Sequence, residues 1–257
     1  MGILNATPDS FSDGGKFRSA KDAIAMAEIM IAAGVDLIDI GGESTRPGAE
    51  PVSLQEELDR VLPVIEGLKN CGLPLSIDTY KAETMRQALH AGVDCVNDIW
   101  ALRQDGAVDA VLENANCGIV LMHMQRDPLT MQFNPEYQNV ITEVMQFLRE
   151  RANILLNKGI DRDRIALDPG FGFGKSLEHN IEMLAKFDVF SEVGYPVLAG
   201  ISRKSMLGKI TGKESDQRLA PSIAAAIMAA DRGARIIRVH DVPETVDALK
   251  LWEAVNT

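Results

Sequence analysis

Short apolar segments recur at regular intervals along the chain, and each is followed by a segment with the apolar spacing of a helix. The eight apolar segments are residues 2–4, 35–40, 74–77, 93–96, 118–122, 164–167, 197–201 and 235–239. Strands that are apolar on both faces are typical of parallel sheets covered by helices. Because strand-like and helix-like segments alternate throughout, the pattern predicts consecutive parallel βαβ units.

Start and stop signals place the helices between these strands. Ser53 followed by Glu56 forms a capping box before the second helix, and Gly92 closes the third. Pro135 stands at a favourable first position for a long helix. The expected helices cover residues 20–33, 54–68, 82–91, 107–115, 135–157, a segment from about 176, 220–230 and 243–255.

Eight such units in a chain of 257 residues predict one (β/α)8 TIM barrel, an α/β fold, with residues 1–257 as a single domain. The alternative is an open, doubly wound sheet. That fold would need a glycine-rich dinucleotide motif after the first strand, and residues 5–9 (NATPD) do not provide one. The sequence therefore favours the closed barrel.

Composition limits the partners that the chain can have. It carries 37 acidic and 26 basic residues, a net charge of -11, which disfavours nucleic acid and anionic membranes as partners. An anionic substrate would need a local cationic site. The three cysteines form no paired motif, so we expect free thiols, as in a reducing cytoplasm. The sequence has no run of eighteen apolar residues that could span a membrane, so we expect a cytoplasmic protein.

Polar side chains gather where the predicted strands end, which is where barrel enzymes have their active sites. They are Asn5, Asp39, Thr45, Arg46, Asp78, Asn97, His123, Asp168, Lys204, Arg238 and His240. Asp78, Asn97 and Asp168 would suit a flat ligand with neighbouring N–H groups, such as a pterin or a guanine. Asn5, Arg238 and His240 lie where the first and last strands meet, a common place for phosphate in these barrels.

Simpler interpretations compete for several of these residues. Asp39, Asp78 and Asp168 could each be a turn or cap residue, and His123 fits either interpretation. Arg238 interrupts an apolar strand, so we expect it to face a charged partner. The glycine-rich residues 170–174 by themselves indicate only a flexible loop. The alanine-rich helix 220–230 suggests a close helix contact, and we expect it to join two subunits of a homodimer.

Seven motifs occur in order along the chain. They are GILNATPDSFSDGG (2–15), DIGGESTRPG (39–48), SIDT (76–79), VND (96–98), LDPGFGFGK (167–175), GISRKS (200–205) and RVHD (238–241). Together they resemble bacterial dihydropteroate synthase over essentially the whole chain. The short segment that this family carries before the first strand is missing, and we expect its loss to leave the barrel mouth unaffected.

The resemblance implies an enzyme that joins 6-hydroxymethyl-7,8-dihydropterin pyrophosphate to p-aminobenzoate, giving dihydropteroate and pyrophosphate in folate biosynthesis, and that sulfonamides inhibit. It implies Mg²⁺ as cofactor and these two small molecules as substrates. Carried onto this sequence, Asp78, Asn97, Asp168 and Lys204 would bind the pterin. Thr45, Arg238 and His240 would contact pyrophosphate, Arg46 and Ser205 p-aminobenzoate, and Asn5 the metal. Asp78, Lys204 and Asn5 would carry the catalysis.

The mechanism that the resemblance implies is dissociative. Cleavage of the C–O bond leaves a pterin cation, which Asp78 would stabilise, and residues 7–15 and 42–48 are expected to close over the substrates. Arg203 has no role in this scheme and is interpreted as a structural or surface cation. The alternatives are a corrinoid-dependent pterin methyltransferase, a non-catalytic pterin-binding protein and, less favoured, a metal-dependent hydrolase.

Overall fold

Eight parallel strands form the centre of the molecule. The computed structural model describes residues 1–6, 20–44, 50–127, 130–131 and 133–256. Six strands pair in chain order: β1 (Gly2–Asn5), β2 (Ile38–Gly41), β3 (Leu75–Asp78), β4 (Cys95–Asp98), β5 (Gly118–Met122) and β6 (Ile165–Asp168). A second, shorter ladder pairs β7 (Leu198–Ala199) with β8 (Ile236–Ile237).

Two parallel bridges join the ladders at their edges. Val239, after β8, bridges to Gly2 on β1, and Val197, before β7, bridges to Leu167 on β6. The N–H of Ile3 donates to the carbonyl of Val239 at 2.9 Å. Backbone pairing therefore continues through all eight strands, and the predicted TIM barrel is confirmed.

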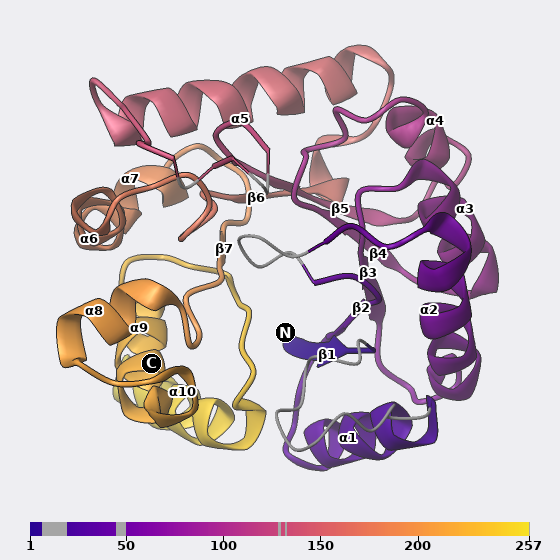
Figure 1. Cartoon of the computed structure of the whole chain (residues 1–257), viewed down its shortest axis with the longest axis horizontal. Coiled ribbons are helices and arrows are strands. Elements are labelled where there is room, and N and C mark those ends of the chain that lie inside the picture. The colour runs from indigo at the N-terminus through magenta and orange to yellow at the C-terminus, as the bar shows by residue number, and fades with distance from the viewer. Residues whose placement is uncertain (7–19, 45–49, 128–129, 132, 257) are drawn as a thin grey trace.

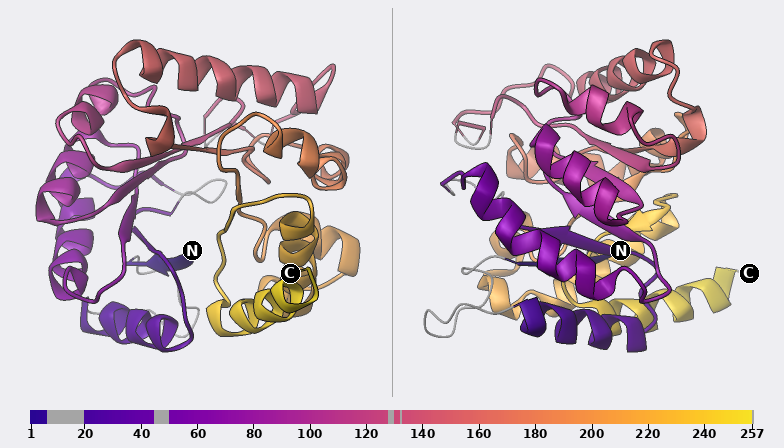
Figure 2. Two further views of the ribbon diagram at one scale, coloured as in Figure 1. Left: turned by 180° about the vertical axis from the view of Figure 1, so that it is seen from behind. Right: turned by 90° about the vertical axis from the view of Figure 1, so that its right-hand side faces the viewer.

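Helices surround the strands on the outside (Figures 1 and 2). They are α1 (Ala20–Ala32), α2 (Leu54–Leu68), α3 (Ala82–Ala91), α4 (Ala107–Leu112), α5 (Val140–Asn157), α6 (Leu177–Ala185), α7 (Phe187–Ser191), α8 (Ser205–Thr211), α9 (Leu219–Asp231) and α10 (Val242–Asn256). The sequence predicted all of these except α7 and α8. Within the described part of the chain, no helix is long and apolar enough to cross a membrane.

Two predicted helix boundaries are wrong. The fifth helix begins at Val140 rather than at residue 135, because the Asn139 side chain accepts the N–H of Thr142 at 2.9 Å and thereby caps the helix. The fourth ends at Leu112 rather than at residue 115. There the side chain of Asn114 accepts the N–H groups of Asn116 and Cys117, which replaces helical hydrogen bonding with a turn.

Side chains alternate between the barrel interior and the helix layer. Val120, Ala166 and Leu198 form an apolar cluster separate from the main core, with Ile236 packed against it. Asp168 and Arg238 each lie two residues beyond a member of this group, Ala166 and Ile236, respectively. Since successive side chains of a strand point to opposite faces, both polar residues point to the same interior, nearer the carboxyl ends of their strands.

Candidate active site

A row of polar residues crosses four neighbouring strands near their carboxyl ends. The strand register pairs Asn5 with Gly41, Gly41 with Asp78, and Asp78 with Asn97. Gly41 places no side chain between Asn5 and Asp78. A Cβ at Gly41 would be in ordinary contact with both, 3.8 Å from Asn5 Oδ1 and 3.9 Å from Asp78 Oδ2. The register thus brings three of the predicted site residues into one row.

An ion cluster connects this row with the last strand. Arg238 donates from Nε to Asp39 Oδ2 and from Nη2 to Asp78 Oδ2, both at 2.6 Å. Asn97 Nδ2 donates to Asp39 Oδ2 at 3.0 Å. The prediction that Arg238 faces a charged partner is confirmed. Asp39 is fully buried within this cluster and is therefore more than a turn residue.

Two carboxylate oxygens in the cluster are buried without a partner. Asp39 Oδ1 and Asp78 Oδ1 accept no hydrogen bond from the residues that the structure describes. A buried, unpaired carboxylate oxygen is unfavourable, and such groups in a native protein are commonly functional. The two oxygens therefore make acceptors for the N–H groups of a ligand.

Burial and neighbouring charges shift the pKa values of the residues in this cluster. It raises the pKa of Asp78 to about 7, while the nearby Arg238 acts in the opposite direction and Asp39 adds to the increase. Burial alone would lower the pKa of Arg238, but the carboxylates of Asp39 and Asp78 raise it above its ordinary value. The arginine stays charged, whereas Asp78 can change its protonation near neutral pH.

The segment after β7 carries Lys204, and Asp168 at the end of the neighbouring strand β6 lies beside this segment. Lys204 Nζ donates to the carbonyl of Phe171 and lies 4.2 Å from the centre of the Phe173 ring. Burial lowers the pKa of Lys204 to about 8, although the charge of Asp168 counteracts it. Burial raises the pKa of Asp168, and Lys204 opposes that shift. The charges of the two groups thus stabilise each other.

The other predicted site residues differ in how they are placed. His240 contacts Ser202 twice. Its backbone N–H donates to the serine Oγ at 3.2 Å, and its Nδ1 lies 3.1 Å from the same oxygen. Ser205 is exposed and is the first residue of α8. Thr45 and Arg46, together with the predicted loop 7–15 and most of the loop 42–48, lie outside the described residues.

Comparison with known proteins places this site in a family. The model of the pterin binding enzyme family matches residues 1–240. The chain is 49% identical over 257 residues to the dihydropteroate synthase of Haemophilus influenzae, covering 99% of this chain and 92% of the relative. It is 48% identical to the Escherichia coli dihydropteroate synthase, covering 99% and 90%. The chain belongs to the dihydropteroate synthase family.

Solved structures of the family agree with this assignment. A Yersinia pestis dihydropteroate synthase complexed with a sulfonamide drug superposes with a TM-score of 0.95 at 46% identity, covering 99% of this chain and 93% of the other. A Burkholderia cenocepacia dihydropteroate synthase complexed with 7,8-dihydropteroate gives 0.91 at 52% identity, with 99% and 90% covered. Dihydropteroate synthases are transferases, so the chain belongs to an enzyme family of that class.

The glycine-rich segment of the family motif is fixed in place, and its interpretation as a flexible loop is wrong. Gly170 has a φ of +71°, and a Cβ there would lie 2.0 Å from the carbonyl oxygen of His123. Lys175 Nζ donates to the carbonyls of Gly170 at 2.9 Å and Phe173 at 3.0 Å. The segment is therefore a tight turn around a buried ammonium group, next to Asp168 and the Phe171 carbonyl that Lys204 contacts.

His123 supports this turn. Its Nδ1 lies 2.9 Å from Lys175 Nζ, and its carbonyl also accepts from that ammonium at 3.3 Å. Burial, followed by the charge of Lys175, lowers the pKa of His123 to about 2. The ring is neutral and packs against the Lys175 side chain, so His123 has a structural function beside the site.

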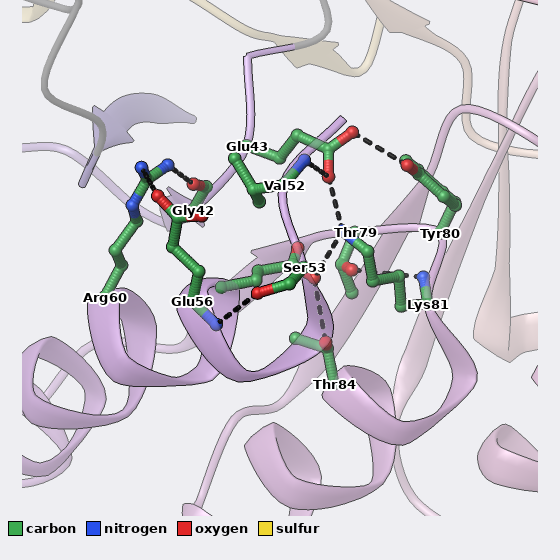
Figure 3. Close-up of polar contacts among 11 residues, drawn as sticks. Gly42, Glu43, Val52, Ser53, Glu56, Arg60, Thr79, Tyr80, Lys81 and Thr84 are labelled. Atoms are coloured by element: carbon green, nitrogen blue, oxygen red, sulfur yellow. Dashed lines mark hydrogen bonds and ion pairs between the residues drawn. The ribbon is translucent and has the colours of Figure 1, made fainter. Parts of the chain in front are cut away.

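A second ion network, which the sequence did not suggest, lies at the base of the segment that carries Thr45 and Arg46 (Figure 3). Glu43 accepts the Tyr80 hydroxyl at 2.8 Å and the N–H of Val52 at 3.3 Å, and it pairs with Lys81. Lys81 also lies 3.1 Å from Glu57. The network therefore connects both ends of this segment with the residues that follow β3.

Proposed function

We propose that the chain is a dihydropteroate synthase that joins 6-hydroxymethyl-7,8-dihydropterin pyrophosphate to p-aminobenzoate. The observation that carries the proposal is the buried Asp39–Asp78–Asn97–Arg238 cluster, with its two unpaired carboxylate oxygens. A pterin ring offers several N–H donors along one edge, which such acceptors can bind. The Burkholderia cenocepacia enzyme complexed with 7,8-dihydropteroate and the Xanthomonas albilineans enzyme with 4-aminobenzoic acid support this choice of substrates.

In this proposal the pterin lies between the two walls of the mouth. Asp78, Asn97 and Asp168 provide acceptors and an amide, and Lys204 approaches from the facing side. Phe173, which lies under Lys204, adds an aromatic surface beside the flat ligand. These contacts would fix the orientation of the pterin and hold its reactive methylene carbon at the open end of the barrel.

The reaction needs cleavage of the bond between that carbon and the pyrophosphate oxygen. The electron pair leaves with pyrophosphate, and the resulting pterin cation is stabilised by the carboxylate of Asp78. The p-aminobenzoate nitrogen then forms the new C–N bond and loses one proton to solvent. The arylamine is neutral at pH 7, so no strong base is required for its attack.

Arg238 connects these events because it contacts both acidic residues. A guanidinium has five N–H donors, and the contacts with Asp39 and Asp78 use two of them. The remaining donors can bind pyrophosphate oxygens, together with Thr45 and His240. Arg238 would then neutralise the leaving group while it orients the carboxylates of the pterin site.

Mg²⁺ fits the donor set at Asn5. The described residues contain no group of three His, Cys, Asp or Glu side chains that could form a preformed metal site. Mg²⁺ commonly takes one or two protein oxygens together with substrate phosphates. Asn5 would offer its amide oxygen beside Asp78, and the ion would supply neutralisation of charge on the leaving pyrophosphate.

The remaining substrate and the assembly complete the proposal. Arg46 and Ser205 would bind the carboxylate of p-aminobenzoate, and sulfonamides would compete for that position.

A homodimer would form through α9, which exposes Met228 to 49%, and light scattering would test it. The three cysteines are free, which agrees with a reducing cytoplasm.

A direct assay tests the function. Purified protein is incubated with dihydropterin pyrophosphate, p-aminobenzoate and Mg²⁺, and pyrophosphate and dihydropteroate are measured together. We expect equal amounts of both products and inhibition by a sulfonamide that p-aminobenzoate relieves. Pyrophosphate release without dihydropteroate, or the absence of both, would contradict the proposal.

A further inference from the structure

Arg203 precedes two residues of the proposed site, Lys204 and Ser205, yet the proposed function gives it no task. Its guanidinium forms a two-pronged ion pair with Asp241, in which Nε lies 3.0 Å from Oδ2 and Nη2 contacts Oδ1. Asp241 directly follows His240, another residue of the site. The pair therefore connects the segment after β7 with the segment after β8.

The backbone of Arg203 is held in an uncommon conformation. Its φ is +57°, in the left-handed region that residues with a side chain seldom adopt. The N–H of Arg203 donates to Ser222 Oγ at 2.9 Å, and its carbonyl accepts from Arg218 Nη1 at 3.0 Å. Both partners belong to α9 or the residue before it, so α9 and Asp241 together determine this conformation, which sets the direction in which Lys204 continues.

Side-chain contacts here replace a backbone ladder. The pairing of β7 with β8 ends at Ala199 and Ile237. Beyond it, Ser202 contacts His240 and the adjacent Arg203 contacts Asp241. Two consecutive residues after one strand thus pair with two consecutive residues after the other, at the level of the mouth.

We propose that Arg203 is a positioning residue that, through Asp241, fixes Lys204 and Ser205 relative to Arg238 and His240. The inference rests on the proposed function, because it concerns how the two proposed substrate positions are aligned. Loss of the pair would disturb the β7 and β8 side of the mouth. The contact between Asn97 and Asp39 joins β4 to β2 and would persist. Of the proposed pterin contacts, Asp78, Asn97 and Asp168 would keep their places, and Lys204 alone would be displaced. Arg203 would therefore affect the reaction with p-aminobenzoate more than the binding of the pterin.

A double-mutant cycle tests the inference. Arg203→Gln, Asp241→Asn and the double variant are compared by kcat/KM for p-aminobenzoate and by calorimetric affinity for a pterin ligand. We expect each single variant to lose on the order of tenfold in kcat/KM, since small misplacements of a reacting group reduce rates strongly. The double variant should be no worse than either single variant. Pterin affinity should fall by less than kcat/KM in all three, since Lys204 is one of several proposed pterin contacts.

Matched controls separate positioning from other roles. Arg86 and Glu113 form an ion pair between segments away from the mouth, with 3.0 Å between Nε and Oε1; its carboxylate is more exposed than that of Asp241, and its arginine is about as exposed as Arg203. Arg86→Gln and Glu113→Gln should leave kcat/KM unchanged. Arg203→Lys keeps the charge but loses the two-pronged contact, so it should recover only part of the activity, and it remains informative if Arg203→Gln folds poorly.

Three results would overturn the inference. A normal kcat/KM in Asp241→Asn together with a loss in Arg203→Gln would show that Arg203 contacts a substrate directly. Normal activity in both single variants would make the pair a structural contact alone. An equal loss of pterin affinity and of kcat/KM would show a general disturbance of the mouth. An inactive wild-type protein would instead contradict the proposed function itself.

Discussion

The two sides of the barrel mouth differ in both charge and construction. Asp39, Asp78, Asn97 and Asp168 come from strands of four residues in the continuous β1–β6 ladder. The cationic residues Lys204 and Arg238 follow β7 and β8, whose ladder has only two residues in each strand. Backbone pairing therefore places the acceptors and also Arg238, whose N–H donates to the carbonyl of Ala199 and whose neighbour Val239 bridges to Gly2. Lys204 lies beyond the end of β7 and depends on contacts outside the ladder.

This difference gives the two sides separate tasks. A ladder fixes the spacing of neighbouring side chains closely, which suits recognition of a rigid ring such as a pterin. Lys204, which is placed by contacts beyond the ladder, can adjust to the bound substrates. Arg238 joins the sides, because it comes from β8 and contacts Asp39 on β2 and Asp78 on β3. The predictions below change one side at a time.

The largest effect is expected at Asp78. Asp78→Ala removes the carboxylate that would stabilise the pterin cation, so kcat/KM should fall by at least about 100-fold. Arg238 would keep its contact with Asp39, and the fold should persist, with an unchanged circular dichroism spectrum. Asp188→Ala, at an exposed position of α7, is the control and should behave as the wild type. Activity near the wild-type value in Asp78→Ala would contradict the proposed role.

Lys204 provides the corresponding change on the cationic side. Lys204→Ala should lower kcat/KM by about 100-fold, because a buried charged contact near the reacting groups is lost. The thermal midpoint should change little or rise, since burial of this ammonium is itself unfavourable. A large fall in the midpoint would show that Lys204 holds the fold rather than the substrate.

The pH dependence of kcat/KM tests the two sides of the mouth separately in the wild-type protein. Asp78, with a pKa of about 7, loses its negative charge as the pH falls through 7, and Lys204, with a pKa of about 8, loses its positive charge as the pH rises through 8. The value of kcat/KM for the pterin substrate should therefore be highest between about pH 7 and 8. Lys204→Arg should shift only the alkaline limb upward. A limb that stays in place would exclude Lys204 as its source.

Sequence reasoning found the residues whose position follows from strand ends. The apolar run before Asp78 and that before Asp168 predict where these side chains emerge, and an arginine within an apolar strand predicts a charged partner for Arg238. Asp39 was harder, because residues 35–40 contain two aspartates and the pattern does not decide which one faces the interior. The structure decides, since Asp39 is fully buried in the cluster.

Other features depend on contacts that a pattern in the sequence does not contain. Arg203 and Asp241 are 38 positions apart, and either alone fits a surface charge. The acceptors of Lys175 are mainly backbone carbonyls, which every residue has. The short helix α8 follows its strand within a few residues, too soon for helical spacing to identify it. These features depend on the three-dimensional structure and not on a local sequence pattern.

Asp39 gives a prediction of intermediate size. Asp39→Asn removes the charge that Arg238 Nε contacts while it keeps the shape of the side chain. The unpaired Oδ1 of Asp39 would accept an N–H of the ligand. Loss of such a charged hydrogen bond corresponds to about 1.5–3 kcal/mol, so pterin affinity should weaken by roughly 10- to 100-fold. Calorimetric titration with a pterin ligand measures this directly. Unchanged affinity would limit Asp39 to a structural role.

The smallest effect is expected at Glu43, and it tests whether placement by side chains is confined to β7 and β8. Glu43→Gln removes the charge that pairs with Lys81. Its single amide oxygen can replace either Oε1, which accepts the Tyr80 hydroxyl, or Oε2, which accepts the Val52 N–H, but not both. Lys81 keeps Glu57 as a partner at 3.1 Å, so its buried charge is not left unpaired. The loss should therefore be moderate: we expect the KM for p-aminobenzoate to rise about two- to fivefold, because Arg46 follows Glu43 closely in the chain, and pterin affinity to stay unchanged. Glu113→Gln is the control. An equal change in pterin affinity would show that the network supports the acidic side as a whole, because Lys81 and Tyr80 follow β3 directly and could then transmit the disturbance to Asp78.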